Sequence, residues 1–160
     1  MAGKPNEAKQ GSYRLRFPHK YKGPLDENGD VHFRSSWESR LFFYMDHNAN
    51  FVEWGSESIT IPYLFSLDNK VHKYYPDIVC KAQLADGSLQ TFILEVKPDS
   101  QTKMPSKPKN RSIDRKKRYE QEMYVYVKNQ DKWKYTEEYC KKNNYVFLLV
   151  TENEIFGRNR

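Results

Sequence analysis

The sequence has few cysteines and no long apolar run, and both absences limit what the protein can be. Its two cysteines, Cys80 and Cys140, lie far apart and match neither a disulfide framework nor a zinc-ligand spacing, so we expect a reducing, cytosolic setting. No apolar stretch approaches the roughly 18 residues that span a bilayer, and the N-terminus lacks the apolar segment of a signal peptide. We therefore expect a soluble, unexported protein without membrane contact.

Positive charge is concentrated in one segment. The 160 residues include 27 Lys and Arg against 21 Asp and Glu, a formal charge of +6. Residues 98–118 hold eight basic and two acidic residues, and eight minus two equals the whole net charge. Such a segment favours a polyanionic partner such as double-stranded DNA, although it is also compatible with a solvated loop. The candidate DNA-contacting residues are Lys103, Lys107, Lys109, Arg111, Arg115 and Lys116.

The length favours one domain, which we place at residues 35–160, behind a basic, irregular and partly mobile arm at residues 1–34. Ser35 and Ser36 offer an N-cap for a helix that ends near residues 46–48. The spacing of its apolar residues predicts a buried face made of Trp37, Leu41, Tyr44 and Met45.

The remaining elements are predicted from composition and periodicity. Residues 58–63 are expected to form a strand closed by Pro62 or soon after, and prolines keep the basic segment at about 98–111 as a surface loop. Residues 112–144 favour one or two helices with a break near Lys128. The apolar run at 145–150 is typical of a buried, central strand.

Residues 74–84 and 89–96 are predicted to form the two arms of a β-hairpin. A two-residue turn would set Asp77 opposite Val96, whereas a three-residue turn at 85–87, with Gly87 in the left-handed conformation, sets Asp77 opposite Glu95. We predict the three-residue turn. Glu95 and Lys97 then share one face, about 7 Å apart along the strand. The opposite, apolar face is expected to hold Phe92, Leu94 and Val96 together with Tyr74, Ile78 and Cys80.

This combination of groups suits phosphodiester hydrolysis. That reaction needs a deprotonated water and compensation of the charge that develops on the phosphate and the leaving oxygen, and Mg²⁺ can supply each. Because Mg²⁺ keeps several waters, Asp77, Glu95 and the backbone carbonyl of Val96 suffice as its protein ligands, and we expect Mn²⁺ to substitute. Lys97 is predicted to activate the water and stabilise the phosphate. The alternative is a plain ion pair between Glu95 and Lys97.

Glu38 is the fourth candidate catalytic residue. It borders the buried stripe of the first helix and could supply a third carboxylate for a second ion. Its alternative role is to complement the dipole at the N-terminus of the helix.

The ordered set of a helix Glu, then Pro-Asp, then Glu-x-Lys resembles the PD-(D/E)xK, or restriction-endonuclease-like, nuclease superfamily. The residues around these motifs, over roughly 20 to 155, are similar to the head completion nucleases of T-even-type phages and, more distantly, to the TnsA transposon endonucleases. The segments that carry this resemblance are residues 34–38, 54–63, 74–77 and 94–98, and Asn129 followed by Lys132 and Trp133.

The resemblance implies an α/β fold with an αβββαβ core around a mixed sheet flanked by helices. It also implies a metal-dependent DNA endonuclease that processes packaged DNA ends during phage head completion, in the host cytoplasm or the virion, with phage head or portal proteins as partners and no small-molecule cofactor. Two alternatives stay open. One is a non-catalytic DNA-binding plug on a nuclease scaffold, and the other is a junction or repair nuclease, which would differ only in its substrate.

Overall fold

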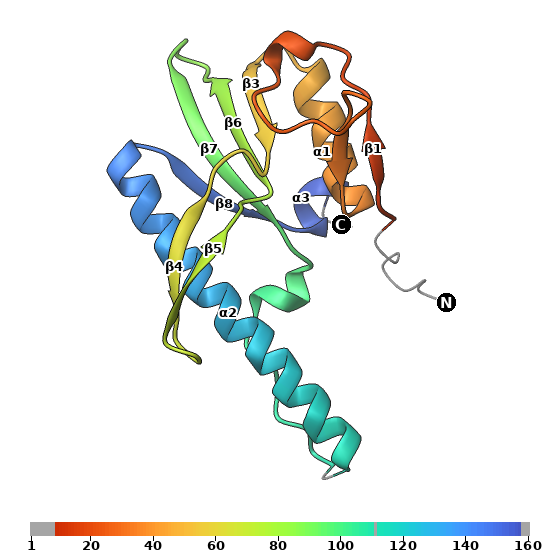
Figure 1. Cartoon of the computed structure of the whole chain (residues 1–160), viewed down its shortest axis with the longest axis vertical. Helices are drawn as coiled ribbons and strands as arrows, with labels where there is room; N and C mark the ends of the chain where they lie inside the picture. The colour runs from red at the N-terminus through yellow and green to blue at the C-terminus, as the bar shows by residue number, and fades with distance from the viewer. Residues whose placement is uncertain (1–8, 111, 158–160) are drawn as a thin grey trace.

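A four-stranded mixed sheet lies at the centre of the structure, a computed structural model that describes residues 9–110 and 112–157 (Figure 1). Strands β3, β6 and β7 pair antiparallel, and β8 joins the edge of β7 in parallel. In spatial order the strands are β3 (Phe51–Ser56), β6 (Ile78–Gln83), β7 (Leu89–Val96) and β8 (Val146–Val150).

Two helices complete the predicted αβββαβ order, α1 (Ser36–His47) before β3 and α2 (Ile113–Asn143) before β8. A short helix, α3 (Glu152–Phe156), follows β8, and two 3₁₀ turns are present, η1 (Pro18–Lys20) and η2 (Asp99–Thr102). None of the helices within the described residues combines the length and apolar character needed to cross a membrane.

A second hairpin is inserted between β3 and β6 and lies against α2 (Figure 1). Its strands are β4 (Ile61–Phe65) and β5 (Lys70–Tyr74), which pair only with each other in the described structure. The predicted strand at 58–63 is therefore displaced by a few residues. Pro62 does not close the strand but sits within it, opposite Lys73, because a strand of a two-stranded sheet has a free edge that tolerates a missing N–H.

The N-terminal segment is more regular than the predicted irregular arm. Residues 1–8 lie outside the described residues, but β1 (Gly11–Tyr13) and β2 (Val31–Phe33) form an antiparallel pair. Tyr21 and Val31 are buried in the core, and the Tyr13 hydroxyl donates a 2.8 Å hydrogen bond to Asp46 at the end of α1. This part of the arm is thus an integral layer of the fold.

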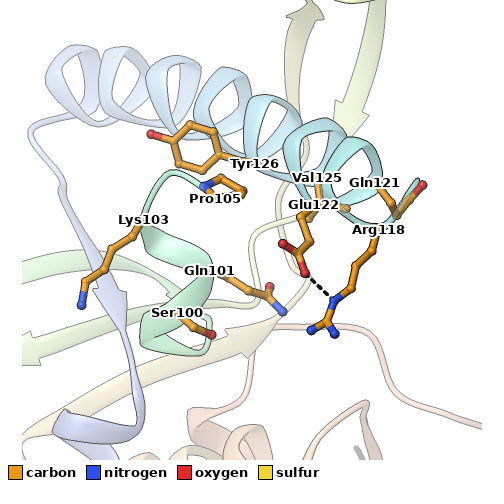
Figure 2. A pocket seen from close by; sticks show the side chains of 9 residues that line it. All are labelled: Ser100, Gln101, Lys103, Pro105, Arg118, Gln121, Glu122, Val125 and Tyr126. Carbon is orange, nitrogen blue, oxygen red and sulfur yellow. Dashed lines mark hydrogen bonds and ion pairs between the residues drawn. The ribbon is translucent and has the colours of Figure 1, made fainter. Parts of the chain in front are cut away.

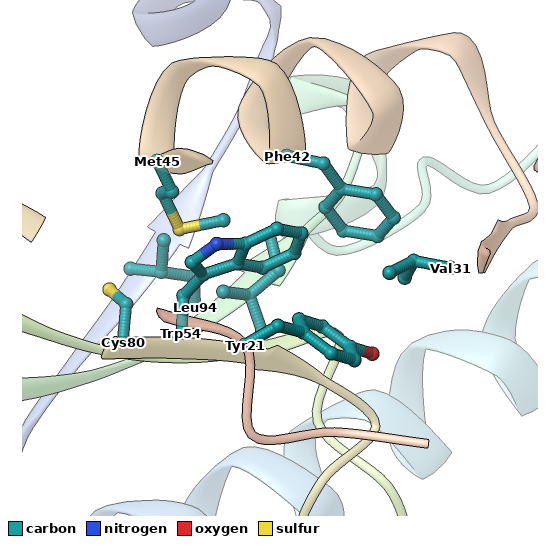
Figure 3. Packing of buried hydrophobic residues seen from close by; sticks show 8 residues of the cluster. Tyr21, Val31, Phe42, Met45, Trp54, Cys80 and Leu94 are labelled. Atoms are coloured by element: carbon teal, nitrogen blue, oxygen red, sulfur yellow. The ribbon is translucent and has the colours of Figure 1, made fainter. Parts of the chain in front are cut away.

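One core cluster fills the space between the sheet and α1 (Figure 3). Trp54 lies at its centre as part of β3, with the Phe42 ring 5.1 Å and the Tyr21 ring 4.8 Å away. The predicted helix face was partly wrong, because Tyr44 is 55% exposed and Phe42 is fully buried. The buried members of the cluster are Tyr21, Val31, Phe42, Met45, Trp54, Ile78, Cys80 and Leu94.

The second core cluster covers the opposite face of the sheet, under α2 and the β4–β5 hairpin. Its buried members are Ile61, Tyr63, Phe65, Tyr74, Ile93 and Cys140. Tyr74 therefore lies on the opposite side of the sheet from Ile78 and Cys80, contrary to the prediction, because β5 ends at Tyr74 and the chain turns through Pro76 before β6 begins.

Of the two alternatives predicted for residues 112–144, one helix or two, the structure shows one, but two details of the C-terminal half were wrong. α2 is one continuous helix of 31 residues without a break near Lys128, and its left-handed cap residue is Asn144. β8 is an edge strand rather than a central one, and Val146 and Leu148 remain 38% and 44% exposed. The apolar composition of this strand is explained by contacts on both faces of the sheet, since Phe147 packs into the second cluster and Val150 into the first.

Candidate active site

The register of the β6–β7 hairpin sets two carboxylates side by side. Leu84 and Ser88 close a three-residue turn in which Gly87 has φ +84°, a conformation that favours glycine. The last paired positions at the other end are Ile78 and Leu94, so the next residues outward, Asp77 and Glu95, lie opposite each other. The predicted register is thereby confirmed.

Asp77 is fixed by the strand that it faces. Its Oδ2 accepts a 2.7 Å hydrogen bond from the backbone N–H of Val96. Its own carbonyl accepts a 3.3 Å hydrogen bond from the backbone N–H of Glu57. Within residues 9–110 and 112–157, Oδ1 of Asp77 makes no hydrogen bond of its own, so it is the oxygen that remains for a ligand.

Glu95 is almost completely buried, at 2% exposure, and two neighbours satisfy its carboxylate. The Tyr74 hydroxyl donates a short hydrogen bond to Oε2, and the Lys97 ammonium lies 3.0 Å from Oε1. A buried carboxylate without such partners would cost several kcal/mol. Tyr74 was not predicted as a site residue, because its side chain was assigned to the other face of the sheet.

The charges in this cluster shift one another's protonation. Burial raises the pKa of Asp77 above its ordinary value, and the nearby Glu95 charge raises it further, against the opposing effect of Lys97. Burial alone would lower the pKa of Lys97, but the charges of Glu95 and Asp77 outweigh burial and raise it. The Asp77 and Glu95 carboxylates therefore repel each other, and a cation bound to them would relieve that repulsion.

An open pocket of about 460 Å³ gives solvent access to these groups. The sequence-predicted residues in its lining are Asp77, Glu95 and Lys97, and the others are Pro24, Arg34, Glu57, Lys73, Tyr74, Tyr75 and Lys132. Arg34 and Glu57 form a 2.9 Å ion pair in this lining, and Glu57 has φ +47°, which is unusual for a residue with a side chain.

Lys132 is a pocket residue that sequence reasoning did not assign. It comes from α2, and its ammonium lies 5.1 Å from the centre of the Tyr74 ring. Burial lowers its pKa, while the Glu95 charge acts in the opposite direction. The family resemblance included Asn129, Lys132 and Trp133, and it was the sequence feature that could have identified Lys132. The local sequence does not show that this helix lies beside the hairpin.

Glu38 lies near the site but caps its own helix. Its Oε2 accepts a 3.0 Å hydrogen bond from the backbone N–H of Arg34, while its own N–H donates to the Ser35 hydroxyl at 3.2 Å. Its charge contributes to the raised pKa of both Asp77 and Lys97, so it belongs to the same electrostatic cluster. Glu38 is not among the residues that line the pocket.

The donor set suits a hard cation that retains water. Among the described residues, no group of three or more His, Cys, Asp or Glu side chains is arranged to hold a metal ion. Mg²⁺ is typically held by one or two carboxylates. Asp77 and Glu95, which lie opposite each other, supply two, and the backbone carbonyl of Val96 offers a third oxygen. The repulsion between the Asp77 and Glu95 carboxylates also favours a divalent cation.

The basic segment lies apart from this pocket. In Figure 1 it runs along the N-terminal half of α2, beyond the sheet. Lys103 pairs with Asp99 at 2.6 Å and borders a different pocket, of about 420 Å³, where Arg118 pairs with Glu122 (Figure 2). Arg111 lies outside the described residues. The other candidates, Lys107, Lys109, Arg115 and Lys116, are exposed and do not line the pocket with Asp77.

Comparison with known proteins agrees with the fold and the motifs. The family model for the N-terminal domain of TnsA-like endonucleases matches residues 48–152, more than half of the chain. The head completion nuclease of Enterobacteria phage T4 is 35% identical over 134 residues, which cover 84% of this chain and 85% of that protein. The resemblance to restriction-endonuclease-like nucleases is thereby confirmed, and the chain belongs to the TnsA-like endonuclease family.

Proposed function

We propose that the protein is a Mg²⁺-dependent endonuclease that hydrolyses phosphodiester bonds of double-stranded DNA and processes packaged DNA ends during phage head completion. One observation carries the proposal: Asp77 and Glu95 lie opposite each other on adjacent strands, with the Lys97 ammonium 3.0 Å from Glu95, in a pocket open to solvent. The similarity to a phage head completion nuclease supports the biological setting.

The residues that line the pocket have different chemical roles. Asp77, through Oδ1, and Glu95 would hold the cation together with the Val96 carbonyl, and Mg²⁺ bound there would lower the pKa of a water and offset charge on the phosphate. Lys97 is held by Glu95 beside the place where that charge develops. From that position its ammonium would orient the attacking water and stabilise the charge on the phosphate.

Glu38 has a supporting role in this scheme. Its carboxylate caps α1 and adds negative charge near Asp77 and Lys97, which strengthens cation binding and keeps the Lys97 ammonium protonated. A second ion held by Glu38 would require that the side chain leave its cap.

The setting follows from the same proposal. The enzyme acts in the cytoplasm of the host cell on DNA that has entered the head, where phage head or portal proteins present the DNA end, and it can remain in the virion. Mn²⁺ is expected to replace Mg²⁺, because both accept oxygen ligands.

A gel assay on supercoiled, linear and single-stranded DNA tests the activity. Purified protein should cleave duplex DNA in Mg²⁺ or Mn²⁺ and not in EDTA. Asp77→Ala and Lys97→Ala should abolish cleavage while the fold persists by circular dichroism. Lys81→Ala is the matched control, because Lys81 lies in the same hairpin and pairs with the half-exposed Glu53. Cleavage that survives EDTA and both substitutions would refute the proposal, and metal-independent DNA binding without cleavage would favour a plug.

A further inference from the structure

Lys132 carries a positive charge that the described structure leaves without an acidic partner. It is half-buried on α2, and within residues 9–110 and 112–157 its side-chain ammonium forms no ion pair or hydrogen bond, although its backbone carbonyl accepts one from the Thr136 hydroxyl. By contrast, Lys97 and Lys103 each pair with a carboxylate at 3.0 Å and 2.6 Å. A half-buried, unpaired ammonium is costly, so its position needs a reason.

The Tyr74 ring accounts for part of that position. The Lys132 ammonium lies 5.1 Å from the ring centre, within the range of a cation–π contact. This contact keeps the ammonium in the pocket that Asp77, Glu95 and Lys97 also line. A cation–π contact leaves the three N–H donors of a lysine available to another ligand.

A second unpaired lysine lies one turn earlier on the same helix. Lys128 is also half-buried, and its ammonium lies 5.7 Å and 5.9 Å from the ring centres of Phe65 and Tyr124. Positions four apart share one helix face and are about 6 Å apart along the axis. The two lysines therefore form a short row of ammonium groups that make no ion pair among the described residues, and the row leads out of the pocket along α2.

We propose that Lys132 binds a phosphate oxygen of the DNA strand in the catalytic pocket, with Lys128 extending the anion-binding row along α2. This inference rests on the proposed nuclease function and adds a second contact to the substrate phosphate. Lys97 contacts the phosphate from the hairpin, and Lys132 contacts it from α2. Because phosphate groups carry no base identity, this contact positions the strand without reading its sequence.

The described candidates in the basic segment, which exclude Arg111, do not offer an equivalent site. Lys103 is neutralised by Asp99, and the residues that line the catalytic pocket include none of the predicted DNA contacts. The structure thus assigns phosphate binding near the reaction to α2 and leaves the basic segment to contact DNA farther away.

Binding without cleavage provides the first test. The affinity of the full chain for a duplex oligonucleotide would be measured by fluorescence anisotropy at several salt concentrations, in EDTA and in Ca²⁺. Loss of one phosphate contact reduces the salt slope by roughly 0.9. We expect that reduction in salt slope for Lys132→Gln, together with a loss of affinity. Lys132→Arg keeps the charge and should lose less affinity. Lys134→Gln is the matched control, because Lys134 is exposed on the same helix and does not line the pocket.

Cleavage in Mg²⁺ provides the second test. Lys132→Gln should reduce kcat/KM by about 10- to 100-fold, the range expected for one charge-assisted hydrogen bond, and Lys132→Arg should restore most of it. Thermal melting identifies variants that fail to fold. A Lys132→Gln variant that binds with an unchanged salt slope and cleaves like Lys134→Gln would overturn the inference.

The two proposals fail in different ways. If the wild-type protein binds DNA but does not cleave it, the endonuclease proposal fails, while the salt slope of Lys132→Gln still decides whether Lys132 holds a phosphate. If the wild-type protein does not bind duplex DNA in either buffer, both proposals are refuted.

Discussion

Tyr74 and Glu95 belong to different sheets, yet the Tyr74 hydroxyl donates a hydrogen bond to the Glu95 carboxylate. Both side chains are buried, at 4% and 2% exposure. Burial raises the pKa of Tyr74, and the Glu95 charge raises it further, so the hydroxyl keeps its proton at any working pH. The inserted β4–β5 hairpin thus orients a carboxylate of the central sheet, and the same tyrosine ring faces Lys132.

Tyr74→Phe should weaken catalysis as well as the fold. The substitution keeps the ring and its contact with Lys132 but removes one hydrogen bond to the buried Glu95, which is worth about 1.5–3 kcal/mol when the acceptor is charged. We expect kcat to fall about tenfold in a DNA cleavage assay. Tyr63→Phe is the control, since Tyr63 lies in the same core cluster. Equal effects of the two changes would contradict a positioning role for Tyr74.

Asp77→Asn should stabilise the metal-free protein in a pH-dependent way. The pKa of Asp77 is raised in the folded state by burial and by Glu95, so its contribution to stability is greatest below the unfolded value near 4 and is lost as pH rises toward the folded value. Asn keeps an acceptor for the Val96 N–H and has no charge to lose. In EDTA, the melting temperatures of the variant and the wild type should therefore be similar near pH 4. As the pH rises, the variant should melt at an increasingly higher temperature than the wild type. A difference in melting temperature that is the same at pH 4 and pH 7 would contradict this explanation.

The hairpin register could be predicted from the sequence because turn chemistry is local. Gly87 has no side chain to oppose a left-handed backbone, and that single turn sets every pairing up to Asp77 and Glu95. The three residues at the centre of the proposed site follow directly, since they flank or belong to paired strands.

The other site residues depend on tertiary contacts that the sequence does not express. Tyr74 was placed on the wrong face because residues 74–84 were treated as one strand, whereas the chain leaves β5 at Tyr74 and starts β6 at Ile78. Lys132 is one of 27 basic residues, and its short-range sequence context does not distinguish it from the others. It becomes distinct only where α2 crosses the inserted hairpin.

The corrected face of α1 can be tested through stability. Phe42 is fully buried against Trp54, whereas Tyr44 is 55% exposed. Phe42→Ala should lower the free energy of unfolding by about 3–5 kcal/mol, because it removes buried contacts and leaves a cavity. Tyr44→Ala should change it by less than about 1 kcal/mol. Denaturant titration of both variants measures the difference, and similar losses would contradict the burial seen here.

The last prediction separates the two roles of Glu38. Glu38→Gln keeps an oxygen to accept the Arg34 N–H and is a normal residue at this capping position, so the variant should melt close to the wild type. Glu38→Ala keeps the Ser35 N-cap but loses the hydrogen bond from the Arg34 N–H, and it should be less stable by about 1 kcal/mol. The charge acting on Asp77 and Lys97 is absent from both variants.

Cleavage by these two variants then shows whether the Glu38 carboxylate supports catalysis or only stabilises the start of α1. If its charge supports catalysis, Glu38→Gln should lose at least about tenfold in kcat/KM although its stability is normal. The measurement is a cleavage time course at fixed Mg²⁺, repeated at higher Mg²⁺ to compensate for weaker cation binding. Partial recovery at high Mg²⁺ indicates that the charge acts through the cation. A Glu38→Gln variant that cleaves like the wild type shows instead that the side chain only caps α1, and the site then consists of Asp77, Glu95 and Lys97.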